Sequence, residues 1–294
     1  LGCQAVWPSD RGVEATFTFV RSYARTWFGY QLAKSPDRTD TALAPPREVL
    51  RELYARVFEH MQHDEEMRWV AGYLEASVPW NQVAQFAWAE QRAGREDVCL
   101  VPFGLMEGRV ARMQAQPAPG VRIADADEAA LTTLHAHLAR TRSPAWRSCL
   151  DLTPARFDLA RIEAVWASAG LHRSRRCLCA WQDATLLAVA IVETGETGAS
   201  LFNLLDSVRL FAIADDGERA FEALLAAAAR RYEALDKDLF VLYREVWPLE
   251  AALAAGLGDL GGGKLWAIRR HLLPDFLEHI AALLAPKGPR KRSS

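Results

Sequence analysis

The chain has 294 residues, 50% of them hydrophobic and 24% charged, which is the composition of a folded protein with one large domain or two ordinary ones. Its formal net charge of −2 excludes a general attraction to nucleic acid or to anionic membranes, so no nucleic-acid partner is expected. No apolar run reaches the ~18 residues that span a bilayer, and no signal peptide is visible. A cytoplasmic location is therefore predicted.

The five cysteines are odd in number and irregular in spacing, which argues against a disulfide framework. Cys177 and Cys179 stand two apart, too close for a zinc knuckle, and spacing places no third ligand beside His60 and His63. No metal site is expected. The first residue is Leu rather than Met, as in a piece of a longer polypeptide.

In the first part of the chain, strands and helices are predicted to alternate. Strands are expected at residues 14–23, 68–75 and 98–106, and helices at residues 46–61 and 80–92. Residues 113–120 then break the pattern with Pro117, Pro119 and Gly120, which is typical of a linker. The sequence thus predicts a first unit at residues 1–112 and a second at residues 121–284.

The second unit has a predicted order β-α-α-β-β-β-α-β-α-β. Strands are expected at 121–123, 177–182, 186–194, 200–213, 239–243 and 265–270, with helices at 127–142, 153–168, 217–235 and 249–255. A closing helix is expected at 274–284. The last ten residues, 285–294, contain Lys287, Arg290, Lys291 and Arg292 and are predicted to be a disordered basic tail. The strand–helix–strand unit near the end favours parallel pairing.

This order resembles the GNAT-type (N-acetyltransferase-like) acyl-CoA acyltransferase superfamily. Residues 211–221 stand where that family has its Q/R-x-x-G-x-G/A turn, and residues 251–257 stand where it has a helix ending in Gly-Phe. The resemblance covers residues 121–271, about half the chain, and implies an α/β fold of the α+β type with a mixed sheet.

The two halves also resemble each other. The segment from Tyr73 to Trp80 parallels the segment from Tyr243 to Pro248, and each leads into a short helix that stops at a glycine, Gly94 or Gly256. The sequence therefore predicts a tandem repeat, in which residues 1–112 form a truncated GNAT-like lobe that lacks the front strands of the fold. The alternative is an unrelated insertion with a similar order of elements.

The resemblance implies acetyl-CoA or acyl-CoA as the cofactor, with its pyrophosphate at a helix N-terminus. The matching residues are Gly217, Glu218, Arg219 and Ala220. Asp215 and Asp216 precede them, and an ordinary Asp N-cap is the competing interpretation because its carboxylate would occupy the same N–H groups. In the first lobe the matching turn, residues 43–47, has two prolines and no glycine, so this lobe is not expected to bind CoA in this way. Its aromatic side chains Trp27, Tyr30, Tyr73 and Trp80 are candidates to line a cleft.

Acyl transfer to an amine needs a base and often an acid. The family commonly takes the acid from a tyrosine four residues before the helix-ending glycine, where this chain has Ala252. The candidate bases are Glu193, at the end of a strand, and Asp206, within the predicted central strand. Tyr243 and Glu245, at the end of the next strand, are candidate substrate contacts.

Three functional hypotheses follow from the resemblance. The first is an acyl-CoA-dependent N-acyltransferase of unknown acceptor, with the second lobe active. The alternative is a catalytically inactive GNAT-like module that binds a ligand or a protein and regulates a larger polypeptide. The third is transfer from an acyl carrier protein instead of a small-molecule acyl donor, with the predicted basic turn of Arg173, Arg175 and Arg176 contacting the acidic carrier.

Overall fold

The computed structural model describes residues 1–9, 12–34, 46–200 and 203–285. Within them lies one mixed sheet of eleven strands, and the predicted α/β class is confirmed. The strands are β1 (Gly2–Ser9), β2 (Gly12–Tyr23), β3 (Thr26–Lys34), β4 (Trp69–Glu75), β5 (Val98–Arg109), β6 (Val121–Asp125), β7 (Arg173–Gln182), β8 (Thr185–Gly195), β9 (Ser207–Ala212), β10 (Leu239–Arg244) and β11 (Gly258–Arg269).

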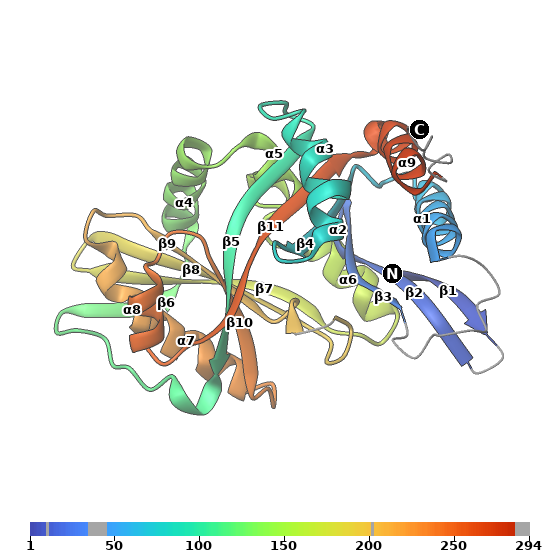
Figure 1. Ribbon diagram of the computed structural model, residues 1–294. Helices are drawn as coiled ribbons and strands as arrows, with labels where there is room; N and C mark the ends of the chain where they lie inside the picture. Colours follow the sequence, from blue (N-terminus) through green and yellow to red (C-terminus); the bar gives the residue numbers. More distant parts are fainter. Residues whose placement is uncertain (10–11, 35–45, 201–202, 286–294) are drawn as a thin grey trace, which may run out of the picture.

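Helices cover both faces of this sheet (Figure 1). The α-helices are α1 (Pro46–Gln62), α2 (Pro79–Asn81), α3 (Ala87–Glu90), α4 (Glu128–Thr141), α5 (Pro144–Cys149), α6 (Ala160–Ser168), α7 (Phe221–Glu233), α8 (Leu249–Ala254) and α9 (Leu273–Leu284). A π-helix, η1 (Gln82–Phe86), joins α2 to α3, and a 3₁₀ turn, η5 (Gly217–Ala220), precedes α7. Most of the tail prediction, residues 286–294, lies outside the described residues.

The strand order is symmetric about the centre of the sheet. It reads β1-β2-β3-β4-β11-β5-β10-β9-β8-β7-β6, so β5 and β11 form an antiparallel pair in the middle. Figure 1 shows these two long strands running through the centre of the molecule. On either side the same series follows, with β4 and β10 next to the centre and the parallel strands β3 and β9 next to them. The order is that of two lobes related by a pseudo-twofold axis.

The two lobes exchange their last strands. β5 belongs to the first half of the chain but pairs with β10 of the second, and β11 belongs to the second half but pairs with β4 of the first. Each lobe therefore contains a strand from the other half of the chain. Strands from both sides of the predicted linker at residues 113–120 belong to one sheet.

Two strands of the first lobe were not predicted. β1 and β3 flank β2 and pair with it on both sides, so this lobe has three strands before α1 instead of one. The predicted strand at residues 200–213 was too long, because its regular part begins only at Ser207. By strand order the first lobe lacks a counterpart of β6.

The helices between β6 and β7 cover one face of the first lobe. Trp146 of α5 and Trp166 of α6 belong to one buried cluster with Phe28 and Trp69 of the first lobe. The Trp69 indole N–H donates to Ser148, at 3.1 Å, and the Trp166 indole N–H donates to the Arg21 carbonyl, at 3.0 Å. Helices of the second lobe thereby bury apolar surface that the first lobe cannot cover with helices of its own.

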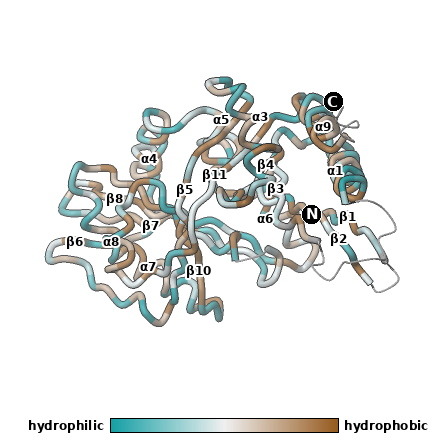
Figure 2. The backbone as a smooth tube through the Cα atoms, in the orientation of Figure 1, coloured by the Kyte–Doolittle hydropathy of each residue, from teal (hydrophilic) through white to brown (hydrophobic). Residues whose placement is uncertain are grey.

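The opposite face carries a separate core in each lobe. α1 and α9 pack on the first lobe with Val49, Leu53 and Phe276 buried, and α7 packs on the second with Leu224 and Leu225 buried. Figure 2 shows α1 as a mixture of hydrophilic and hydrophobic positions, as expected of an amphipathic helix that covers a sheet. None of the described helices is long and apolar enough to cross a membrane.

Candidate functional site

A cavity of about 630 Å³ lies in the first lobe, where β3 and β4 separate. The two strands pair in parallel from Thr26↔Trp69 to Gly29↔Gly72. Beyond that pair both strands continue, β3 to Lys34 and β4 to Glu75, with the cavity between them. Residues of α1, α2 and η1 close it on one face of the sheet.

Glycines occupy the point where the strands separate. A Cβ atom on Gly29 would lie 3.0 Å from the ring of Phe19, and one on Gly72 would lie 3.1 Å from the side chain of Leu74. The absence of side chains at Gly29 and Gly72 leaves the entrance to the gap open.

The second lobe differs at the same point. When Tyr73 and Tyr243 are taken as equivalent, the last pair Gly29↔Gly72 corresponds to Val208↔Leu242, which is also the last pair between β9 and β10. Val208 and Leu242 are both fully buried. The first lobe therefore has a slot where the second has two packed aliphatic side chains.

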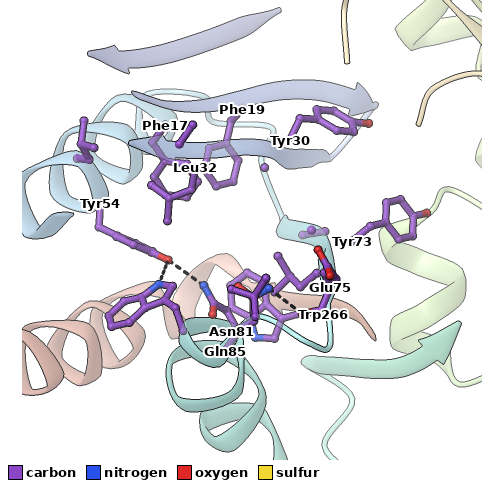
Figure 3. Close-up of a pocket in the computed structure, with 18 of the residues that line it drawn as sticks. Phe17, Phe19, Tyr30, Leu32, Tyr54, Tyr73, Glu75, Asn81, Gln85 and Trp266 are labelled. Carbon is purple, nitrogen blue, oxygen red and sulfur yellow. Dashed lines mark hydrogen bonds between the residues drawn. The ribbon is translucent and has the colours of Figure 1, made fainter. Parts of the chain in front are cut away.

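The cavity wall is mainly apolar and aromatic, as Figure 3 shows. Among the lining side chains are Phe17, Phe19, Leu53, Trp80, Trp266 and Phe276. Glu75, at the exposed rim, is the one carboxylate in the described lining, and Lys, Arg and His are missing from that lining. Such a surface accepts an apolar ligand and offers no counter-charge to a buried anion.

A small polar group lies at the buried end of the cavity. The hydroxyl of Tyr54 accepts hydrogen bonds from the Trp80 indole N–H, at 3.1 Å, and from the Gln85 amide, at 2.8 Å (Figure 3). Burial raises the pKa of Tyr54 to about 12, so its hydroxyl is neutral at physiological pH. Tyr54 is 1% exposed and Gln85 6%.

Glu193, a predicted base, lies in the core between two arginines. Its carboxylate pairs with Arg175 at 2.6 Å and with Arg173, and it accepts a hydrogen bond from the Tyr23 hydroxyl of the first lobe at 2.9 Å. Burial raises the pKa of Glu193, but Arg175 and Arg173 outweigh burial and bring the pKa to about 2. These contacts favour a structural link between the lobes.

Arg173 and Arg175 do not form the exposed basic turn that the sequence predicted. Both lie on β7 and are 3% and 2% exposed. The Arg175 guanidinium also donates to the carbonyls of Leu150, Asp151 and Phe157. Because both side chains are buried, they cannot meet the surface of a carrier protein.

Asp206, the other predicted base, lies just before β9 and not within a strand. It is 4% exposed; its carboxylate pairs with Lys237 at 2.9 Å and accepts the Gly195 N–H at 2.9 Å. The ion pair and the backbone contact hold the loop before β9 against the end of β8. Its role as a base stays a prediction.

Tyr243 and Glu245, the predicted substrate contacts, belong to a buried cluster between the lobes. Tyr243 stacks on Tyr73 with ring centroids 4.2 Å apart, and the Arg209 guanidinium lies 4.2 Å from the Tyr243 ring centre. Glu245 pairs with Arg209 at 2.9 Å and with Arg142 at 3.0 Å. The cluster fills the space beside the separating ends of β9 and β10.

The predicted cofactor turn, Gly217, Glu218, Arg219 and Ala220, is the 3₁₀ turn η5. The turn packs on β8: the N–H groups of Ile213 and Ala214 both donate to the Leu187 carbonyl, and a Cβ atom on Gly217 would lie 2.2 Å from that oxygen. Position 217 therefore requires a glycine, because the Cβ atom of any other residue would overlap the backbone of β8.

The aspartate before η5 does not cap it. The Asp216 side chain makes no cap hydrogen bond and instead pairs with Arg219 at 3.0 Å. The interpretation of Asp216 as an ordinary N-cap was therefore wrong. Beside the turn, the Phe221 ring of α7 packs edge to face on the Trp247 ring, with the ring centroids 5.5 Å apart. Both side chains belong to the core of the second lobe.

The candidate catalytic and cofactor residues were predicted in the second lobe. For the first lobe a cleft lined by aromatic side chains was predicted, and three of these, Tyr30, Tyr73 and Trp80, line the cavity. The available signal was the pair of glycines, Gly29 and Gly72, each inside an apolar run where a glycine weakens a strand. The turn at residues 43–47, which argued against cofactor binding in this lobe, lies partly outside the described residues.

Comparisons with solved structures find N-acetyltransferase folds. A tandem GNAT protein from the clavulanic acid biosynthesis pathway aligns at 16% identity over 92% of this chain and 83% of that one, with a TM-score of 0.46. A GCN5-related N-acetyltransferase from Sphaerobacter thermophilus aligns at 13% identity over 91% and 80%, with a TM-score of 0.46. One from Kribbella flavida aligns at 12% identity over 91% and 88%, with a TM-score of 0.43.

The proteins so described belong to the superfamily that the sequence was predicted to resemble. At such identities and scores the likeness concerns the general fold alone. No family model and no curated protein matches the chain.

Proposed function

We propose that this protein is a GNAT-like ligand-binding module, whose first lobe holds an acyl donor of the acyl-CoA class with the apolar acyl chain in the cavity between β3 and β4. The observation that carries the proposal is the glycine pair Gly29↔Gly72, which opens a slot between parallel strands where the second lobe has Val208↔Leu242. The cavity of about 630 Å³ lies within the ~300–1,000 Å³ range of small-molecule sites.

The second lobe has a structural role in this proposal. Glu193 and Asp206 are held in buried ion pairs and are 3% and 4% exposed, so a substrate amine has no open access to either carboxylate. Of the two candidate donors, a small-molecule thioester fits better than an acyl carrier protein, because Arg173 and Arg175 are buried.

Calorimetric titration with acetyl-CoA, octanoyl-CoA and free CoA tests the proposal. The affinity should rise from acetyl-CoA to octanoyl-CoA, since each buried CH₂ contributes about 0.8 kcal/mol, and free CoA should bind weakest. Equal affinity for all three, or no binding by any, would contradict an acyl site in this cavity.

Two substitutions in the lining, with one control outside it, test where the ligand binds. Leu50→Trp on α1 adds an indole to the lining and should weaken octanoyl-CoA binding at least tenfold, whereas Arg51→Trp, next to it but outside the lining, should leave binding within twofold. Gly72→Val narrows the slot and should act like Leu50→Trp. A site in the second lobe would respond to none of the three.

Acyl transfer to an amine is the second candidate function, and Glu75 is the observation that favours it. Glu75 is the one carboxylate in the described lining and lies at the exposed rim of the cavity. Release of free thiol from octanoyl-CoA in the presence of a panel of amines would measure this activity. If transfer occurs at this lobe, Glu75→Gln should lower its rate about a hundredfold without weakening octanoyl-CoA binding.

A further inference from the structure

The buried end of the cavity contains polar atoms that have no partner in the described protein. The oxygen of the Gln85 carboxamide, Oε1, is buried without a hydrogen bond, and so is the indole N–H of Trp266. Both residues line the cavity and are 6% and 4% exposed. Unpaired polar atoms in an apolar site destabilise the protein unless something binds them.

The Tyr54 hydroxyl adds a donor to this group. Its oxygen accepts from both the Trp80 indole and the Gln85 amide, so its own proton remains to be donated. If the Gln85 carboxamide is turned over, its oxygen accepts the Tyr54 proton and its amino group is left unpaired instead. In either orientation one end of the Gln85 amide remains for a ligand.

The backbone around Gln85 is also unusual. Gln85 belongs to the π-helix η1, a form that is rare and often found at functional sites. From this turn the Gln85 amide donates to Tyr54 of α1, 31 residues earlier in the chain. The feature is independent of the unpaired atoms and occurs in the same place.

The chemistry of the lining restricts what can bind there. Arg, Lys and His are missing from the described lining, and the nearest carboxylate, Glu75, is at the exposed rim. A charged group at the buried end would have no counter-ion, whereas a neutral group that both donates and accepts would satisfy Gln85, Tyr54 and Trp266 together.

We propose that the ligand of the first-lobe cavity carries a neutral hydrogen-bonding group, a hydroxyl or an amide, at the far end of its apolar chain, and that Gln85, Tyr54 and Trp266 receive it. The inference rests on the proposed function in one respect: the cavity must be a ligand site. It specifies the ligand further as a chain that is polar at its distal end. A purely apolar acyl chain would leave the free end of the Gln85 amide and the Trp266 indole N–H without a partner.

A pair of neutral probes, methyl octanoate and methyl 8-hydroxyoctanoate, tests this by calorimetry. They differ only in the terminal hydroxyl. An apolar cavity without hydrogen-bonding groups prefers the first, because the hydroxyl loses its water. The proposal predicts the reverse: the hydroxy ester binds to the wild-type protein about tenfold more tightly.

Gln85→Leu isolates the residue. It should remove the preference for the hydroxy ester while retaining methyl octanoate binding, and it should raise the melting temperature of the unliganded protein because an unpaired buried group is gone. Gln82→Leu is the matched control: Gln82 lies on the same π-helix, outside the lining, and the preference should persist. Tyr54→Phe gives a second test should Gln85→Leu not fold.

The outcomes separate the two proposals. This inference is wrong if Gln85→Leu and Tyr54→Phe keep the preference for the hydroxy ester, or if the wild-type protein prefers methyl octanoate. Neither result contradicts the proposed acyl site. Binding of both esters with the predicted preference but no binding of octanoyl-CoA removes the acyl-CoA donor and supports the polar end. If neither ester binds, this inference is wrong, and the octanoyl-CoA titration alone decides the proposed acyl site.

Discussion

At the residue scale, the predicted catalytic carboxylates show how burial changes the meaning of a residue. In the sequence, Glu193 stood at the end of an apolar strand and Asp206 within the predicted central strand, and both were predicted to be bases. In the structure each is paired with cations, Glu193 with Arg173 and Arg175, and Asp206 with Lys237. Removal of one partner from such a buried group leaves the remaining charge uncompensated.

A pH-dependent stability follows from Glu193. Its pKa in the folded protein is about 2, below the ordinary value of 4.5, so the stabilisation is fully present above about pH 4.5 and is lost as the pH falls toward 2. Glu193→Gln should lower the free energy of unfolding by roughly 3–5 kcal/mol at pH 7, measured by urea denaturation. The difference from wild type should shrink as the pH is lowered from 4.5 to 2.

Glu250→Gln, an exposed carboxylate on α8, serves as the control and should change the free energy of unfolding by less than about 0.5 kcal/mol at neutral pH. A Glu193→Gln difference that stayed constant across the acidic range would show that the ion pairs do not stabilise the fold.

At the scale of elements, the turn before α7 illustrates the same distinction between packing and ligand binding. Gly217 matched a glycine of the family's cofactor turn, but the structure shows it pressed against the Leu187 carbonyl of β8. A substitution there disrupts the packing of the turn whether or not the turn binds a ligand.

Gly217→Ala should therefore destabilise the protein by about 1–3 kcal/mol, because the new Cβ would lie 2.2 Å from a backbone oxygen. Thermal or urea denaturation measures the effect. Gly258→Ala is the matched control, since its Cβ would lie 3.8 Å from the nearest atom. Octanoyl-CoA affinity of the folded Gly217→Ala fraction should equal that of wild type, and a loss of binding there would restore the second lobe as the donor site.

The elements that the sequence predicted well are those with strong apolar runs. β8, β10 and α7 are almost entirely buried and stood out in the sequence. The strand predicted at residues 14–23 corresponds to β2, and β3, which follows it after a two-residue turn, was missed. The shape of the cavity could not be predicted, because it depends on Gly29 and Gly72, 43 positions apart, becoming partners, and register between distant strands is not visible in a single sequence.

At the scale of the whole molecule, the exchange of β5 and β11 makes the two lobes interdependent. Without β11, the first lobe loses the strand that joins β4 to β5, and without β5 the second lobe loses the strand that joins β10 to β11. The lobes also share the buried cluster of Trp146, Trp166 and Trp69. The predicted boundary at residues 113–120 thus separates two segments of chain that share one sheet.

Fragments 1–112 and 121–285 should each fail to fold alone, giving no cooperative unfolding transition by circular dichroism, whereas co-expression should restore a complex with the melting behaviour of the intact chain. The intact chain should unfold in one transition, observed by calorimetry with equal van't Hoff and calorimetric enthalpies. A cooperative transition in either isolated fragment would show that the exchanged strand is dispensable for that lobe.

The central strand exchange also affects how the protein is made. β4 reaches its partner only when β11 is available, and the paired residues Glu75 and Gly263 are 188 positions apart. At the usual speed of ribosomes, β4 waits roughly 10–40 s with one edge unpaired. During this interval the first-lobe cavity lacks Trp266 and Phe276, and the nascent chain exposes an apolar sheet edge. Newly synthesised chains should therefore depend on chaperones until nearly the last residue of the sheet has been translated.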